Sequence, residues 1–170
     1  MAILPIIKAP DPILRVKSKV ITNIGTEELI LLDDMLETMY SAPGVGLSAI
    51  QVGVAKRLIV VDTSKNNIKS NIKMINPEII SNSEEIHTNE EGCLSFPEQF
   101  VQVARSKKIE VSFIDHEKKT KKETFDGFEA IIIQHEIDHL DGNLLIDNVS
   151  SVKKNIILRK MKKMKKLSDK

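Results

Sequence analysis

"IIIQHEIDHLDG", residues 131–142, places His135, Glu136 and His139 within five positions of an otherwise apolar segment. Glycines at positions 127 and 142 bracket about four helical turns, which favours a helix over a buried strand. Residues four apart lie on one face of a helix, so both imidazoles would point at the same position. This spacing is typical of zinc-type hydrolases, and neutral imidazoles suit zinc or ferrous iron. The alternative is a pair of histidines that simply pack in the core.

A site with two histidines needs further groups to become catalytic. Glu136 projects about 100° from His135, so it could reach a water at the metal and exchange protons with it. Catalytic metal sites commonly have three protein ligands and one water. No Glu or His follows His139, whereas Cys93 lies upstream in "NEEGCLSFP". A thiolate binds the same metals, so we predict Cys93 as the third ligand, with an inert buried thiol as the alternative.

The composition predicts one globular domain with an unusual C-terminus. Of 170 residues, 41% are hydrophobic and 29% are charged, with a net charge of +1. Residues 151–170 hold nine Lys/Arg and one acid, which leaves 16 basic and 23 acidic residues in 1–150. We therefore predict a single catalytic metallohydrolase domain over 1–150, with 151–170 as a basic C-terminal helix or tail of the same domain.

The cellular setting is inferred from cysteine usage and hydropathy. A single cysteine excludes an internal disulfide and fits a reducing compartment. The N-terminus lacks the basic start and long apolar run of a signal peptide, and no segment has 18 consecutive apolar residues. We expect a cytoplasmic protein, without a membrane or a specific nucleic acid sequence as partner.

Hydrophobic periodicity predicts the other elements. A helix is expected within 25–44, with Thr26 as its N-cap and Leu29, Leu32, Leu36 and Met39 on one apolar face. Strands are expected within 56–62, 71–80, 84–90, 107–115 and 121–125. No regular strand–helix–strand alternation occurs. The predicted class is therefore α+β, with antiparallel β-sheets packed around a central metal-binding helix, an N-terminal helix and a basic C-terminal helix.

A glycine-rich stretch, "APGVGLSAIQVG" at 42–53, is the third unusual segment. It is not a phosphate-binding loop, because no Gly-Lys-Ser/Thr follows, nor a dinucleotide fingerprint, because it follows a helix. The glycines could serve turns, or they could let the backbone approach a ligand closely. Gln51 offers a side-chain amide that could stabilise an oxyanion.

Three motifs together resemble those of peptide deformylases. "GVGLSAIQVG", "EGCLSFP" and "QHEIDHLDG" occur in the family's order and at compatible separations. The resemblance implies a metal-dependent amidohydrolase that removes the N-terminal formyl group from formylmethionyl nascent polypeptides and releases formate. It thus implies a bacterial role in protein biosynthesis and N-terminal methionine processing.

The resemblance also implies a role for each matching residue. Cys93, His135 and His139 would hold one divalent metal, Fe²⁺ by expectation, with Zn²⁺, Ni²⁺ or Co²⁺ as alternatives. Glu136 would be the general base and acid. The implied oxyanion donors are the Gln51 side chain and the Leu94 N–H. The implied substrate-binding residues are Gly46, Val45, Glu91, Phe128 and Ile131, with Ile132 as a further pocket or core residue.

The match has departures and one additional pairing. Glu91 and Arg105 correspond to a charged pair that positions the cysteine loop in relatives, with ordinary surface charges as the alternative. Ser48 stands where alanine is common, Phe100 where many relatives have arginine, and Ala104 where proline is frequent. The latter two bear on how the rim holds the peptide. His87 and His116 match no ligand position.

Two other function classes and one partner follow from the same residues. A metallopeptidase would share the His-Glu-x-x-His helix, and an RNA- or ribosome-binding module could hold a structural metal. A structural zinc site would need a fourth protein ligand, and none is apparent. The basic C-terminus suits an anionic surface such as the ribosome, with a solvated helix face as the alternative.

Overall fold

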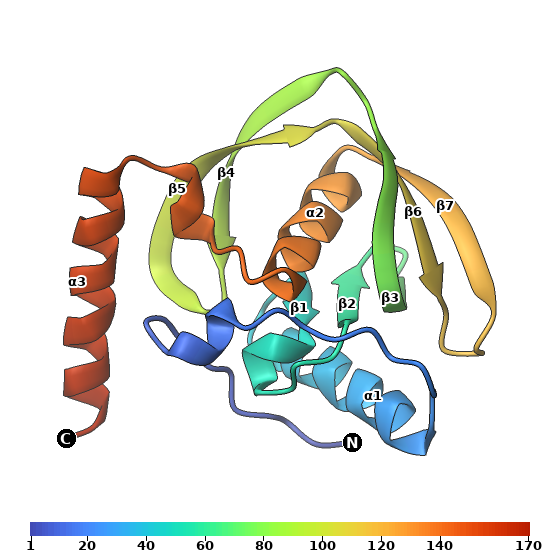
Figure 1. Cartoon of the computed structure of the whole chain (residues 1–170), viewed down its shortest axis with the longest axis horizontal. Coiled ribbons are helices and arrows are strands. Elements are labelled where there is room, and N and C mark those ends of the chain that lie inside the picture. Colours follow the sequence, from blue (N-terminus) through green and yellow to red (C-terminus); the bar gives the residue numbers. More distant parts are fainter.

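The structure is a computed structural model that describes residues 1–170, which form helices and antiparallel strands (Figure 1). The helices are α1 (Thr26–Ser41), α2 (Phe128–Leu140) and α3 (Ser151–Ser168). The strands are β1 (Gly46–Ser48), β2 (Leu58–Asp62), β3 (Asn71–Asn82), β4 (Ile86–Cys93), β5 (Phe96–Ser106), β6 (Lys108–Ile114) and β7 (Thr120–Asp126). Short 3-10 helices are η1 (Pro12–Arg15), η2 (Ala49–Val52) and η3 (Leu145–Asn148). The predicted α+β class is confirmed.

Two separate sheets surround the central helix. One has five strands in the order β1-β2-β3-β6-β7, the other is the β4–β5 ribbon, and every pair is antiparallel. In Figure 1, α2 lies between the ribbon and the larger sheet. Both β1 and β4 have a single paired neighbour, so each leaves one edge free.

Burial of β2 on both faces explains its continuous apolar sequence. Leu58 and Val60 belong to the core cluster that contains the buried side chains of α1. Ile59 and Val61 point to the opposite face, in the cluster that contains the buried isoleucines of α2. Successive side chains of a strand alternate between faces, so a strand covered by helices on both sides requires apolar residues throughout.

The strand predicted within 107–115 is confirmed as β6, and its side chains alternate between two faces. Ile109, Val111 and Phe113 are buried against α2, while Glu110 and Ser112 are half-buried. The C-terminal helix α3 packs through Ile157 and Met161 against a third cluster, built from β5, η3 and the N-terminal segment. Only that face of α3 is buried, as its mixture of lysines and apolar residues requires.

Three details differ from the sequence-based prediction. Strand β1 was not predicted, because three residues inside a glycine-rich stretch carry no periodic signal. Strand β5 was missed because Pro97 and Glu98, the latter at φ +64°, interrupt its alternation near the start. The Thr26 cap was wrong. Gly25 occupies the N-cap, and the Glu28 side chain accepts its N–H at 2.9 Å.

The end of α2 depends on a glycine. Gly142 adopts φ +78°, a conformation that glycine enters without steric cost, just beyond the helix. A Cβ there would lie 2.5 Å from the backbone oxygen of Arg15, so only glycine allows the N-terminal segment to pass this closely. None of the three helices combines the length and apolarity needed to cross a bilayer.

Candidate active site

A cavity of ≈ 570 Å³ opens between the free edges of β1 and β4, with α2 as its floor. Both sheets contribute backbone to its wall, β1 through Gly46 and β4 through its last residues, up to Cys93. Helix α2 contributes the predicted catalytic segment, including His135 and Glu136. The three sequence motifs therefore meet at one place, although they are far apart along the chain.

The three predicted metal ligands converge beside this cavity. One potential ligand atom from each of Cys93, His135 and His139 lies within 4.8 Å of the others, and no fourth residue joins this group. Cys93 Sγ is 3.2 Å from His139 Nε2, and the two imidazole centroids are 5.0 Å apart. Helix α2 supplies both rings from one face, while the end of β4 supplies the thiol.

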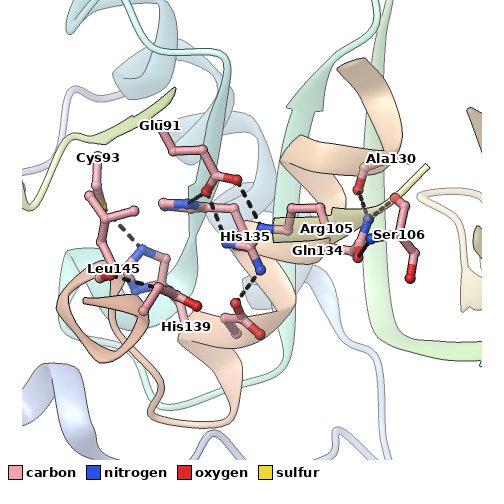
Figure 2. A network of polar contacts seen from close by, with 11 residues as sticks. Glu91, Cys93, Arg105, Ser106, Ala130, Gln134, His135, His139 and Leu145 are labelled. Carbon is pink, nitrogen blue, oxygen red and sulfur yellow. Dashed lines mark hydrogen bonds and ion pairs between the residues drawn. The ribbon is translucent and has the colours of Figure 1, made fainter. Parts of the chain in front are cut away.

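A buried carboxylate fixes the orientation of His135. Figure 2 shows Glu91 between His135 and Arg105. His135 Nδ1 lies 2.9 Å from a Glu91 oxygen, so its Nε2 is left to face the ligand group. Arg105 donates two hydrogen bonds of 2.9 Å to Glu91 and a third, of 2.5 Å, to Asp138 on α2. This arrangement ties the β4–β5 ribbon to the helix and sets the direction of the ring.

Burial and mutual charge determine the protonation of this cluster. Burial alone would raise the pKa of Glu91, but the hydrogen bonds from Arg105 and His135 outweigh it and lower that pKa. Burial opposes charge on His135 too, yet Cys93 and Glu91 raise its pKa well above the ordinary value. Burial and the charge of His135 hold the pKa of His139 well below its ordinary value. Metal binding to this group would therefore displace a proton.

Glu136 points into the cavity and lacks a partner. Its side chain is 4% exposed, and Oε2 makes no hydrogen bond with any protein atom. Burial raises the pKa of Glu136 to about 7, close to the value suited to a proton-transfer group at neutral pH. A cation held nearby would favour the carboxylate and lower that pKa. A Cβ on Gly46 would lie 2.5 Å from Glu136 Oε1, so glycine lets β1 approach the carboxylate.

The predicted oxyanion donors both lie next to Cys93. Gln51 is fully buried in η2, and its Nε2 lies 3.6 Å from Cys93 Sγ. Leu94 follows Cys93 in the turn to β5, and its N–H has no hydrogen-bond partner within the chain. The Leu94 N–H therefore has no competing partner, and Gln51 Nε2 directs one hydrogen toward the thiol.

Most of the predicted site residues line the cavity. These are Gly46, Val45, Glu91, Cys93, Leu94, Phe128, Ile131, His135 and Glu136. Gln51 and His139 lie behind them instead, in contact with Cys93. Ile132 combines the two roles considered for it, because it lines the cavity and belongs to the α2 core cluster.

The departures from the motif lie outside the cavity wall. Phe100 is exposed on β5, and its ring lies against Gly92, where a Cβ would be 2.9 Å from it. Ala104 is exposed farther along the same strand. His87 and His116 are exposed and remote from the ligand group, as expected.

Two residues that support the site were missed by sequence reasoning. Asp138 accepts a hydrogen bond from Arg105. Gln134 joins α2 to β5 by exchanging hydrogen bonds with the Ser106 backbone at 3.2 and 2.9 Å (Figure 2). A polar Gln134 within an apolar run of a buried helix was the available signal, since buried amides are normally paired. The positions of Asp138 and Arg105 in the sequence do not indicate that the two residues pair.

The donor set fits a catalytic divalent metal. One thiolate and two imidazoles suit zinc and ferrous iron, and three protein ligands leave a position open for water or substrate. The carboxylate behind His135 is the outer partner usual for a metal-bound histidine. A closed structural site would need a fourth protein ligand, which this group lacks.

Comparisons with known proteins agree with this geometry. The family described as Polypeptide deformylase matches residues 3–155. The peptide deformylase of Agrobacterium fabrum is 45% identical over 164 residues, covering 96% of each chain. The crystal structure of peptide deformylase from Ehrlichia chaffeensis superposes with a TM-score of 0.94 at 32% identity, covering 98% of this chain and 99% of that one.

A Met-Ala-Ser-bound peptide deformylase from Acinetobacter baumannii has a TM-score of 0.80 at 32% identity, covering 87% of this chain and 99% of that one. The match thus extends over nearly the whole chain in sequence and in structure. The chain belongs to the polypeptide deformylase family, metal-dependent hydrolases that remove the formyl group from the N-terminus of nascent polypeptides.

Proposed function

We propose that Cys93, His135 and His139 hold the metal with which this chain hydrolyses the formyl group of N-formylmethionyl peptides, releasing formate. The main support for this proposal is that these three side chains converge beside a cavity, and that the unpartnered carboxylate of Glu136 points into this cavity. A thiolate with two imidazoles accepts Fe²⁺, Zn²⁺, Ni²⁺ and Co²⁺. The motif resemblance favours Fe²⁺, which metal analysis of anaerobically purified protein would detect.

The proposed chemistry divides between the metal and three groups of the chain. When bound, the ion would supply Lewis acidity, which polarises the formyl group and lowers the pKa of water so that it can lose a proton and attack near neutral pH. Glu136 accepts the proton of the attacking water at Oε2, which has no competing partner, and returns it to the departing amide nitrogen. Gln51 Nε2 and the Leu94 N–H donate to the oxygen on which charge develops.

The free strand edges suit an extended peptide. A substrate lying between β1 and β4 would pair its backbone with Gly46, as an added strand pairs with a sheet edge. Its methionine side chain would enter the apolar part of the cavity, lined by Val45, Phe128 and Ile131. Glu91 contributes indirectly, by holding His135. The Met-Ala-Ser ligand of the Acinetobacter baumannii structure is consistent with this class of substrate.

The direct test separates deformylation from ordinary peptide cleavage. Metal-loaded protein should release formate and Met-Ala-Ser from formyl-Met-Ala-Ser in equal amounts, and should leave acetyl-Met-Ala-Ser intact. Cleavage of internal amide bonds without formate release would identify a metallopeptidase instead. Loss of folded structure on chelation, without any formate release from the loaded protein, would indicate a structural metal.

Gln51→Ala tests the oxyanion assignment. Removing one oxyanion donor typically lowers kcat by about a hundredfold or more, so that loss is expected here. Metal content should stay at the parent level, because Gln51 Nε2 contacts the Cys93 thiol without being a ligand. Gln102→Ala, at an exposed position of β5, is the control and should behave as the parent. Parent-level turnover in Gln51→Ala would remove this residue from the mechanism.

The C-terminal helix is proposed to place the enzyme at the ribosome, in the cytoplasm, as an extension of the catalytic domain formed by residues 1–150. Of the nine basic residues in 151–170, only Lys154 forms an ion pair within the chain, with Asp147. The others are exposed on α3 or just beyond it. Unpaired positive charge on one helix favours binding to a polyanion such as ribosomal RNA.

Charge neutralisation tests this docking better than truncation, because Ile157 and Met161 of α3 belong to the core. The triple variant Lys162→Gln, Lys163→Gln, Lys166→Gln should co-sediment several-fold less with ribosomes, while hydrolysing free peptides normally. The matched control neutralises three exposed, unpaired lysines elsewhere: Lys17, Lys69 and Lys108. Docking through α3 would be contradicted if both variants lost ribosome binding equally, or if neither lost it.

A further inference from the structure

The Gln51 side chain is held at both ends of its amide. Its Oε1 lies 2.9 Å from the Ser48 backbone N and 2.9 Å from Ser48 Oγ. Its Nε2 lies 3.1 Å from Ser95 Oγ and 3.6 Å from Cys93 Sγ. Ser48, Gln51 and Ser95 are all fully buried, so water does not compete for these bonds.

The direction of each hydrogen bond follows from its partners. A backbone N–H can only donate, so the amide end that faces Ser48 must be the oxygen. Ser95 Oγ lies 2.7 Å from the Ile7 carbonyl, which can only accept, so the Ser95 hydrogen is committed there. Ser95 must therefore accept one hydrogen of Gln51 Nε2, which leaves the other directed at Cys93.

The N-terminal segment completes this arrangement. The Ile7 N–H donates to the Gln51 carbonyl at 2.7 Å, and the Ala9 N–H donates to the Ser95 carbonyl at 2.8 Å. Residues 7–9 thus connect η2 with the turn that follows Cys93. Because both ends of the Gln51 amide are hydrogen-bonded to buried groups, the hydrogen that faces Cys93 keeps one direction without a reorganisation during reaction.

We propose that Ser48 and Ser95 are positioning residues, which hold the Gln51 amide with one hydrogen directed at the metal position beside Cys93, where the reacting oxygen would bind. This rests on the proposed role of Gln51 as an oxyanion donor. Ser48 contributes a second bond to Oε1 that alanine, the common residue at this motif position, could not make. Ser95 sets the rotation of the amide about its last bond by accepting one of its two hydrogens.

The test is a pair of double-mutant cycles with formyl-Met-Ala-Ser. Ser48→Ala and Ser95→Ala should each lower kcat by about twofold to tenfold, the worth of one hydrogen bond, with KM and metal content unchanged. In the Gln51→Ala background, neither substitution should lower kcat further. Ser18→Ala is the matched control, because Ser18 is buried and its hydroxyl has no partner.

Nuclear magnetic resonance of zinc-loaded, ¹⁵N-labelled protein gives a second readout, independent of activity. The Gln51 side-chain amide, assigned by its disappearance in Gln51→Ala, should shift and exchange faster with water in both serine variants, and not in Ser18→Ala. Parent kcat in both serine variants, or an equal loss with and without Gln51, would overturn the positioning role. Parent turnover in Gln51→Ala itself would instead reject the proposed role of Gln51.

Discussion

Glu136→Gln is expected to lower turnover of formyl-Met-Ala-Ser by about 10²–10⁴-fold while leaving metal content unchanged. The substitution keeps the size of the side chain but cannot accept a proton. Because Glu136 Oε2 has no hydrogen-bond partner in the protein, the substitution removes the proton acceptor without breaking a hydrogen bond of that oxygen. Glu136 is not in the group that converges on the metal position, so binding of the ion should survive.

Turnover and metal content should be measured on the same preparation, by formate release and by elemental analysis. Glu129→Gln is the control, since Glu129 lies in the first turn of the same helix but outside the cavity, paired with Lys65. It should retain parent turnover. Parent-level activity in Glu136→Gln would reject the base assignment, and metal loss would show that Glu136 acts as a ligand.

Cys93→Ala is expected to lose the metal and, with it, nearly all activity. Removing an outer partner of a metal-bound histidine typically weakens metal binding by about 10–100-fold. Removing a ligand should weaken metal binding by more than this factor, because only two imidazoles would remain to hold the ion. Glu91→Gln, which alters the partner of His135, is the comparison, and its metal affinity should be lower than that of the parent by about 10–100-fold.

Metal affinity should be measured by competition with a chelator, alongside the far-ultraviolet circular dichroism of each variant. We expect Cys93→Ala to keep its secondary structure, because Cys93 is only partly buried at the edge of its core cluster. Unchanged metal affinity in Cys93→Ala would contradict the proposed ligand set. Unfolding of the variant on metal loss would favour a structural metal.

The sequence predicted the elements whose pattern is local. The helix that carries His135 and His139 follows from their spacing and the bracketing glycines. Strand β6 follows from its period of two, which arises because one face is buried and the other half-buried. Cys93 lies more than 40 residues before the two histidines, so the sequence spacing alone could not show that the three side chains converge. The family resemblance indicated Cys93 as the third ligand.

Features that depend on contacts distant in sequence were not predicted. Ser95 bonds to Ile7, 88 residues away, and Arg105 bonds to Asp138, 33 residues away. Serines and charged residues are common on surfaces, so their identity does not show that they are buried and paired. The division of the strands between two sheets likewise depends on how α2 packs, and it creates the two free edges beside the cavity.

X-ray absorption spectroscopy of the zinc-loaded protein most directly tests the coordination of the metal. The proposed ligand set predicts one sulfur at about 2.3 Å, two imidazole nitrogens at about 2.0–2.1 Å and one further light atom that the protein does not supply. Cys93→Ala should remove the sulfur contribution. A spectrum of the parent protein without sulfur, or with four ligands from the protein, would contradict a site of one thiolate, two imidazoles and one open position.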